Sequence, residues 1–229
     1  YAADGAEVGS DAFALNPNGS QFIDPHDPVS GVAGLPDSFI GSAVISGTTD
    51  MAAAITFQRG SQDAASYAAV AEGADTVYLP LLFKGYNGWN TVARVQNLSG
   101  EATDVKLTIW EQDGTDSWSD TLEVPPYASV AFDQGTNALL PSGLLARGKV
   151  ESLDGKPLAA IVTESKSGNI MVYQGFPYGG TRLLTPLLFK EYFGYDSGIQ
   201  VQNMGEAETE VNVSYHLLAP APETIASAP

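Results

Sequence analysis

The sequence contains the same segment twice, 106 residues apart. Residues 80–97 read PLLFKGYNGWNTVARVQN and residues 186–203 read PLLFKEYFGYDSGIQVQN, with ten of the eighteen positions identical. The same spacing relates shorter matches on both sides, which include the upstream pair Val44 and Val150. One fixed spacing over so long a stretch indicates two copies of a single structural unit.

The second half of each copy has the periodicity of a β-strand. Val105, Leu107 and Ile109 alternate with polar or amphipathic residues, and so do their counterparts Val211, Val213 and Tyr215. Apolar residues at every second position are typical of a strand with one buried face. We therefore expect the same type of strand in both copies.

The alanine-rich stretch 51–74 would be taken for a helix on propensity alone. Its counterpart one repeat later reads AAIVTESKSGNIMVYQGF, which is two β-rich runs around a Ser-Gly turn. We therefore expect both stretches to be β-hairpins, with Arg59-Gly60 forming the turn of the first.

Turn residues separate short strands throughout the chain, which predicts an all-β fold of tandem immunoglobulin-like sandwiches. A complete unit of about 106 residues spans 75–180. Residues 1–74 then supply the later strands of a second sandwich, and residues 181–229 supply its early strands followed by an Ala/Pro tail. The sequence thus predicts one whole sandwich and one that is split between the two ends.

A split sandwich exposes strand edges and half of a core, which is unfavourable in water. Three arrangements resolve this. The C-terminal part can complete the N-terminal part of the next molecule, it can fold back on its own N-terminal part, or the chain can be a section of a longer tandem array.

The repeated PLLFK-x-Y-x-G…VQN pattern resembles the Ig-like repeats of large secreted surface proteins of prokaryotes. The resemblance covers most of residues 41–219 and departs from the repeat where Trp89 is replaced by Tyr195. It implies an extracellular or cell-surface role in a stalk, adhesin, sheath or filament.

Charge and composition exclude several other classes. The formal charge is −17, and residues 1–58 and 191–229 contain thirteen acidic residues but no Lys or Arg. This balance argues against nucleic-acid binding, and no apolar run is long enough to span a membrane. The absence of cysteine excludes disulfides and thiol catalysis, and none of the common catalytic motifs is present, so we expect no enzyme.

The expected function is a structural subunit of an extracellular filament or surface array, assembled head-to-tail from copies of itself by strand complementation. The C-terminal half would donate the apolar side chains of Leu187, Leu188, Phe189, Val201, Val211, Val213 and Tyr215. The alternative is a carbohydrate-binding or adhesive module, in which Tyr86, Trp89, Tyr192 and Tyr195 contact sugars or another subunit.

Two further kinds of site have weaker patterns. The acidic turn formed by Glu111, Asp113, Asp116 and Asp120 offers oxygen ligands for Ca²⁺, although a solvated hairpin turn is the favoured interpretation; no other cofactor is expected. Asn18, Asn97 and Asn212 each begin an N-glycosylation acceptor pattern. Asn97 recurs as Asn203 without the following Ser or Thr, which favours a structural role for this asparagine.

Overall fold

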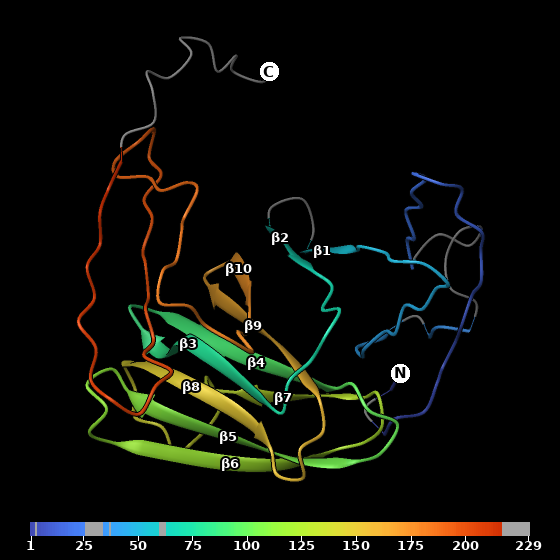
Figure 1. Cartoon of the computed structure of the whole chain (residues 1–229). Coiled ribbons are helices and arrows are strands. Elements are labelled where there is room, and N and C mark those ends of the chain that lie inside the picture. The colour runs from blue at the N-terminus through green and yellow to red at the C-terminus, as the bar shows by residue number, and fades with distance from the viewer. Residues whose placement is uncertain (3, 26–33, 37, 60–62, 217–229) are drawn as a thin grey trace.

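A computed structural model shows an all-β protein (Figure 1). The structure describes residues 1–2, 4–25, 34–36, 38–59 and 63–216, and within these ranges it contains ten strands and no helix. The strands are β1 (Ala54–Arg59), β2 (Asp63–Ala68), β3 (Thr76–Tyr86), β4 (Trp89–Asn97), β5 (Thr103–Glu111), β6 (Ser117–Val124), β7 (Ser129–Asp133), β8 (Leu144–Ser152), β9 (Leu158–Lys166) and β10 (Asn169–Gln174). No helix that could cross a membrane occurs in this part of the chain.

Strands β3 to β10 form two antiparallel groups around one core. One group has the order β6-β5-β8-β3, and the other has the order β7-β4-β9-β10. The groups are joined where β3 and β4 pair over a short stretch next to their connecting turn. This is the two-layer arrangement of a β-sandwich.

The strand order differs from that of a constant-type immunoglobulin domain. There the first strand pairs with the second, whereas here β3 pairs along its length with β8 and meets β4 only at Lys84 and Tyr86. The structure therefore supports an all-β, sandwich-like architecture rather than the standard immunoglobulin topology.

The core is built from the inward faces of both groups. The alternation predicted for residues 105–109 is confirmed, because Val105, Leu107 and Ile109 are buried while the residues between them are partly exposed. Buried side chains from the other strands pack against them, including Val77, Leu79, Ala93, Val95, Val124, Phe132, Ala146, Val150, Leu158, Ala160 and Val162. Burial of each large aliphatic side chain contributes about 1.5–3 kcal/mol to folding.

A β-bulge in β3 explains why the Pro-Leu-Leu sequence is repeated. Two residues, Pro80 and Leu81, lie opposite one residue of β8, because Leu79 pairs with Gly148 and Leu82 with Ala146. The hydroxyl of Tyr173 on β10 donates to the carbonyl oxygen of Leu81 (2.6 Å) and accepts from its amide nitrogen (3.2 Å). One side chain therefore contacts both main-chain polar groups of Leu81 at the irregular point of the strand.

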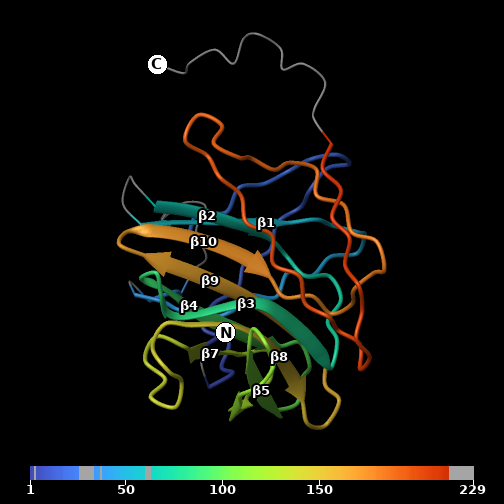
Figure 2. The same ribbon diagram turned by 90° about the vertical axis from the view of Figure 1, so that its left-hand side faces the viewer.

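The predicted hairpin at residues 51–74 is confirmed. Strands β1 and β2 pair with each other in a separate two-stranded sheet. This sheet lies beside β10 (Figure 2), where the side-chain amide of Gln174 donates to the carbonyl oxygen of Ala68 at 2.7 Å. The alanine content of the stretch did not produce a helix, because the strand pairing supplies the main-chain hydrogen bonds.

Candidate assembly site: the two flanking segments

The C-terminal copy repeats the turn geometry of the central unit. Tyr192 and Tyr195 form an isolated antiparallel bridge, and their counterparts Tyr86 and Trp89 pair in the same way. Positive φ angles recur at the three corresponding positions of the two copies: Gly85, Asn87 and Gly88 in the first, and Glu191, Phe193 and Gly194 in the second. The turn sequence thus sets its own conformation without the rest of the sandwich.

Side-chain contacts at this turn are also repeated. The amide nitrogen of Phe83 donates to Thr91 Oγ1 at 3.0 Å, and that of Phe189 donates to Ser197 Oγ at 2.9 Å. The Phe83–Tyr86 ring stack, with centroids 5.7 Å apart, recurs as Phe189–Tyr192 at 5.8 Å.

The loop after this segment is repeated as well. Asn97 Oδ1 accepts from the Ser99 amide nitrogen and Asn203 Oδ1 from that of Gly205, both at 2.9 Å. The asparagine Nδ2 donates to the carbonyl oxygen of Glu101 in one copy and of Ala207 in the other, at 2.6 and 2.7 Å. The turn at 189–197 and the loop at 203–207 therefore have the local structure of the intact unit.

The C-terminal copy has no strand partners, however. In the described residues 177–216 the structure contains no strand, and the expected strand at 211–216 is extended but unpaired. Val95, Val105 and Leu107 are at most 1% exposed, whereas the counterparts Val201, Val211 and Val213 are 44–55% exposed. Of the remaining predicted interface residues, Leu187 and Tyr215 are exposed, and Leu188 and Phe189 are half-buried.

The N-terminal hairpin matches the β9–β10 hairpin with a one-residue slip. Ile55 pairs with Tyr67 in the first hairpin, and Val162 pairs with Tyr173 in the second, so β1 is offset from β9 by 107 residues and β2 from β10 by 106. The connection between β1 and β2 is one residue longer than that between β9 and β10, and its residues 60–62 lie outside the described residues; Arg59, expected in the turn, belongs to β1.

The slip decides which face of β1 corresponds to the core. Ala53, Ile55 and Phe57 take the positions of Ala160, Val162 and Glu164, which are buried in the central unit. These three N-terminal residues are half-buried, while the alternate residues of β1 are exposed. A constant offset of 106 would have assigned the opposite face, because a shift by one residue reverses the sides of a strand.

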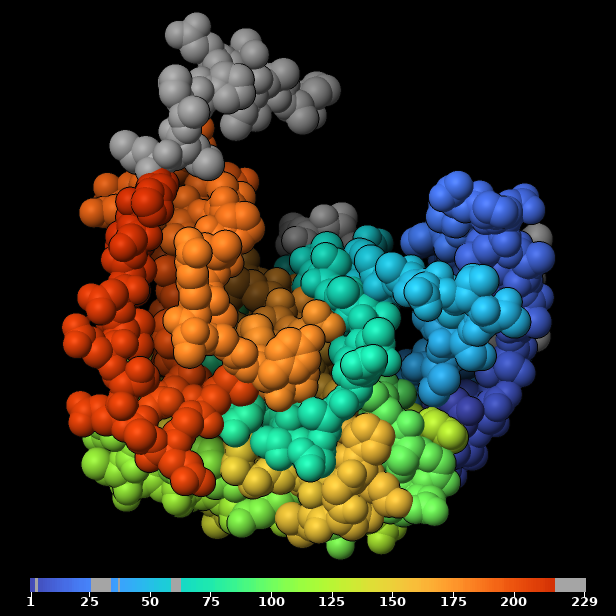
Figure 3. Space-filling model, viewed as in Figure 1, coloured from blue at the N-terminus to red at the C-terminus, as the bar shows by residue number. Residues whose placement is uncertain are grey.

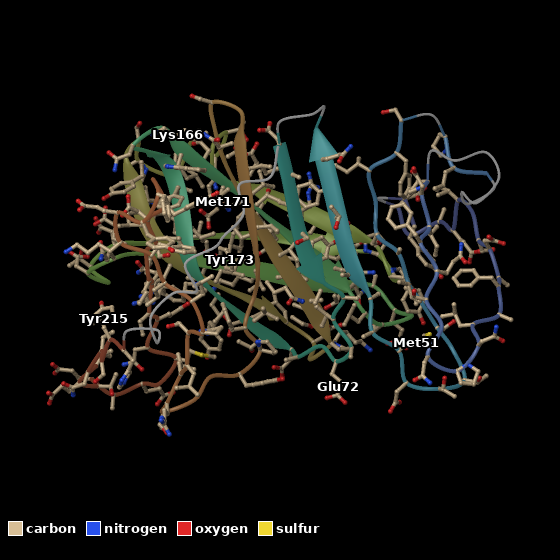
Figure 4. The ribbon with its side chains drawn as sticks, turned by 90° about the horizontal axis from the view of Figure 1, so that it is seen from above. Met51, Glu72, Lys166, Met171, Tyr173 and Tyr215 are labelled. Carbon is tan, nitrogen blue, oxygen red and sulfur yellow. The ribbon has the colours of Figure 1, made fainter. Side chains whose placement is uncertain are left out.

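The two flanking segments lie apart on the central unit. Gln202 Nε2 donates to the carbonyl oxygen of Gly148 at 3.2 Å, whereas the N-terminal segment bonds at Tyr127, whose carbonyl oxygen accepts from Ser42 Oγ at 2.6 Å. Figures 1 and 3 show the C-terminal copy and the residues before β1 on either side of the molecule, with the β1–β2 hairpin between them. Met51 and Tyr215 lie toward opposite sides of the view in Figure 4. Among the described residues, no strand pairing joins the two segments.

The aromatic residues predicted to contact sugars differ between the copies. In the central unit Tyr86 stacks on Phe83, and Lys166 Nζ lies 5.9 Å from the centre of the Trp89 ring. In the C-terminal copy Tyr192 is 39% exposed and Tyr195 is 63% exposed. The aromatic group is therefore more accessible in the incomplete copy.

The acidic turn does not form a metal-binding cluster in the described part of the chain. No group of three metal-ligating side chains occurs there. Asp113 Oδ1 accepts from the amide nitrogen and the hydroxyl of Thr115, which lowers the pKa of the Asp113 carboxyl, and Asp120 accepts from the Thr121 amide nitrogen. Glu111 ends β5, and Asp116 supplies a carbonyl oxygen to the Glu111 amide nitrogen.

The three glycosylation candidates have different surroundings. Asn97 is fully buried, and its Nδ2 also donates to the carbonyl oxygens of Val124 and Pro125, so a glycan there would break these contacts. Asn18 lies exposed in a turn with a positive φ, and Asn212 is exposed beside Glu210.

The sequence reading missed Tyr67, Ile55 and Ile199 as interface candidates. Each corresponds to a buried or core-contacting residue of the central unit: Tyr173, Val162 and Ala93. Tyr67 was visible as a repeated residue, but its contact required the structure. Burial raises the pKa of the Tyr67 hydroxyl above its usual value.

The geometry defines an all-β, sandwich-like protein in which the C-terminal copy of the repeated segment is not paired in a sheet. No protein-family model matches the chain, and no curated protein matches it. Thermotoga maritima 1070 aligns with a TM-score of 0.40 at 17% identity, covering 48% of this chain and 98% of that one. The Anabaena sensory rhodopsin transducer aligns with a TM-score of 0.35 at 16% identity, covering 43% and 91% respectively.

Proposed function

We propose that this protein is a structural, non-enzymatic subunit of an extracellular filament or surface array. In this proposal residues 181–218 of one subunit complete the sandwich begun by residues 8–74 of the next, and the chain assembles head-to-tail. The units are tandem sandwiches of immunoglobulin-like size, and the partner is a further copy of the same chain.

One observation carries the proposal. The C-terminal copy has the turns, ring stack and asparagine loop of the intact unit, but its apolar strand residues are uncovered. Such a segment can gain strand pairing from β1 and β2 of another copy, which are the counterparts of β9 and β10. Strand addition of this kind supplies main-chain hydrogen bonds and apolar burial together.

The energetic balance favours assembly. The counterparts of five of the seven predicted interface residues (Leu82, Val95, Val105, Leu107 and Ile109) lie in the core of the central unit, and each buried aliphatic side chain contributes about 1.5–3 kcal/mol. The acidic ends oppose association, but exposed charges contribute at most about 1 kcal/mol per pair and are screened by salt. We therefore expect assembly to strengthen as the salt concentration rises.

Deletion of residues 181–229 tests the proposal. The purified full chain should form particles whose mass grows with protein concentration in light scattering, and negative-stain images should show linear assemblies. The truncated chain keeps β1 to β10 and should remain monomeric with an unchanged unfolding temperature of the central unit. A full chain that stays monomeric at every concentration would refute the proposal.

The second candidate is a carbohydrate-binding or adhesive module. The exposed aromatic group of the C-terminal copy favours it, because Phe193 is 82% exposed and contacts Tyr192 edge-on at 4.7 Å. Exposed rings of this kind stack on sugars. A glycan array is probed with the full chain and with the double variant Phe193→Ser/Tyr195→Ser. If the protein is a sugar binder, the full chain binds glycans as a monomer and the double variant does not bind them.

A further inference from the structure

The contact between Tyr173 and Leu81 joins two parts of the repeat that are distant in sequence. The tyrosine comes from the last strand of the unit and the Pro-Leu bulge from its first. Both members recur in the flanking segments, as Tyr67 in the N-terminal half and as Pro186-Leu187 in the C-terminal half. Each half thus retains one side of a contact whose other side lies at the opposite end of the chain.

We propose that the Tyr67 hydroxyl of one chain binds the main-chain carbonyl and amide of Leu187 in a second copy, as Tyr173 binds Leu81 within the central unit. This inference rests on the proposed assembly and specifies its register. It makes Tyr67 the residue that positions the bulge of the incoming strand.

The same equivalence fixes the strand pairing. In the central unit Ala93 of β4 pairs with Val162 of β9, and Val95 pairs with Ala160. Transferred through the offsets seen in the structure, Ile199 lies opposite Ile55 and Val201 lies opposite Ala53 of the neighbouring copy. All four side chains then point into the shared core, which brings the half-buried face of β1 against the exposed valine and isoleucine.

A second copy fits this site better than the chain's own C-terminal half. The connection from β10 to the C-terminal copy spans 175–181, and the connection from β2 to β3 spans 69–75, so successive units are joined by linkers of equal length. With linkers of equal length, we expect each unit to be displaced from the preceding one in the same direction. The C-terminal half then lies farther from the N-terminal half of its own chain. In Figures 1 and 4 the C-terminal copy and the residues before β1 lie on opposite sides, with the β1–β2 hairpin between them beside β10.

Engineered disulfides test the register, since the chain has no cysteine of its own. Directly paired residues of antiparallel strands have Cα atoms about 4.5–5.5 Å apart, which suits a disulfide. Ile55→Cys and Ile199→Cys chains are purified separately, mixed and oxidised, and the cross-linked peptides are identified by mass spectrometry. The expected product is a disulfide between the two different chains, and Ala93→Cys/Val162→Cys in one chain is the positive control.

A register control uses Gln200→Cys in place of Ile199→Cys. Its side chain points to the other face, so at least a tenfold lower cross-linking yield with Ile55→Cys is expected. Scattering that shows assembly together with equal yields at both positions would overturn the register and leave the proposed function standing. A disulfide that forms at high dilution within single chains of the double variant Ile55→Cys/Ile199→Cys would show that the chain folds back on itself instead of binding a second copy. Failure of the full chain to assemble would remove the proposed function itself.

The hydroxyl contact has its own matched pair of variants. Tyr67→Phe should weaken assembly by about five- to a hundredfold, the amount expected for two hydrogen bonds, without changing the unfolding temperature of the monomer. Tyr173→Phe removes the same contact inside one chain and should lower that temperature instead. Equal assembly strength of wild type and Tyr67→Phe would show that the hydroxyl has no such role.

Discussion

The central unit and the C-terminal copy contain nearly the same strand sequence in two different states. Residues 80–97 are paired on both sides and enclose a core, whereas residues 186–203 form the same turn and loop with no strand around them. The two segments share the turn, the ring stack and the asparagine loop and differ in strand pairing. Turn geometry is therefore encoded within about ten residues, while strand formation depends on residues elsewhere.

This comparison also separates two kinds of repeated residue. Gly88, Tyr86 and Asn97 recur because a turn, a ring stack or a loop needs them, and these features are present in both copies. Val95 recurs because a core needs it, yet its copy Val201 is exposed. In the proposed assembly, a second copy of the chain would cover this exposed residue.

The largest expected difference between the copies comes from a buried charge. Val95→Asp places a carboxylate at a fully buried position and should cost about 4 kcal/mol or more, which prevents stable folding of the central unit. Val201→Asp should leave the monomer's circular dichroism and melting curve unchanged but abolish assembly. If both changes destabilised the monomer equally, Val201 would be packed in the monomer as Val95 is, and the difference between the two copies would be refuted.

A milder pair measures packing. Leu107→Ala should destabilise the chain by about 2–5 kcal/mol in urea unfolding, because it leaves a cavity in the core. Val213→Ala, at the corresponding exposed position, should change the monomer by less than about 0.5 kcal/mol. If the C-terminal copy were packed in the monomer, the two losses would be similar.

The asparagine loops give a smaller difference. Asn97 and Asn203 make the same local hydrogen bonds, but only Asn97 also donates to Val124 and Pro125 at the end of β6. Asn97→Ala should therefore cost about 2–3 kcal/mol in denaturant unfolding and Asn203→Ala about 1 kcal/mol or less. The difference estimates what the neighbouring strand adds to a preformed loop.

The smallest expected effect depends on pH. Burial raises the pKa of Glu164, so its ionised form is disfavoured in the folded chain, and this cost applies at neutral pH. Glu164→Gln should raise the unfolding temperature slightly at pH 7, and the gain should disappear as the pH falls and the carboxyl becomes protonated. Phe57 takes this position in the N-terminal half and carries no titratable group. The effect of Phe57→Gln on the unfolding temperature should therefore be the same at each pH.

Much of the fold could be predicted from the repeat. The strand at 105–109 and the hairpin at 51–74 were readable because each had a second copy to compare with, and both are present in the structure. The sandwich-like, all-β class followed from them. The pairing order did not follow, because alternation shows which face of a strand is buried but not which strand lies beside it.

The assembly site was only partly predictable. Valine and leucine positions such as Val201 and Val213 could be chosen from the repeat, because apolar residues recur there. The one-residue slip of β1 could not, because the sequence matches on both sides of it follow the constant spacing of 106. Only the pairing of Ile55 with Tyr67 shows which face of β1 is available.

The tyrosine that contacts the β3 bulge also sets how the sandwich responds to alkali. Burial raises the pKa of Tyr173 far above its ordinary value of 10.0. The folded chain therefore keeps this proton while the unfolded chain loses it, and the stability it supports falls only as the pH rises above that value. The corresponding hydrogen bonds proposed for the Tyr67 hydroxyl would not change with pH in acidic or neutral solution, and strong base would weaken them.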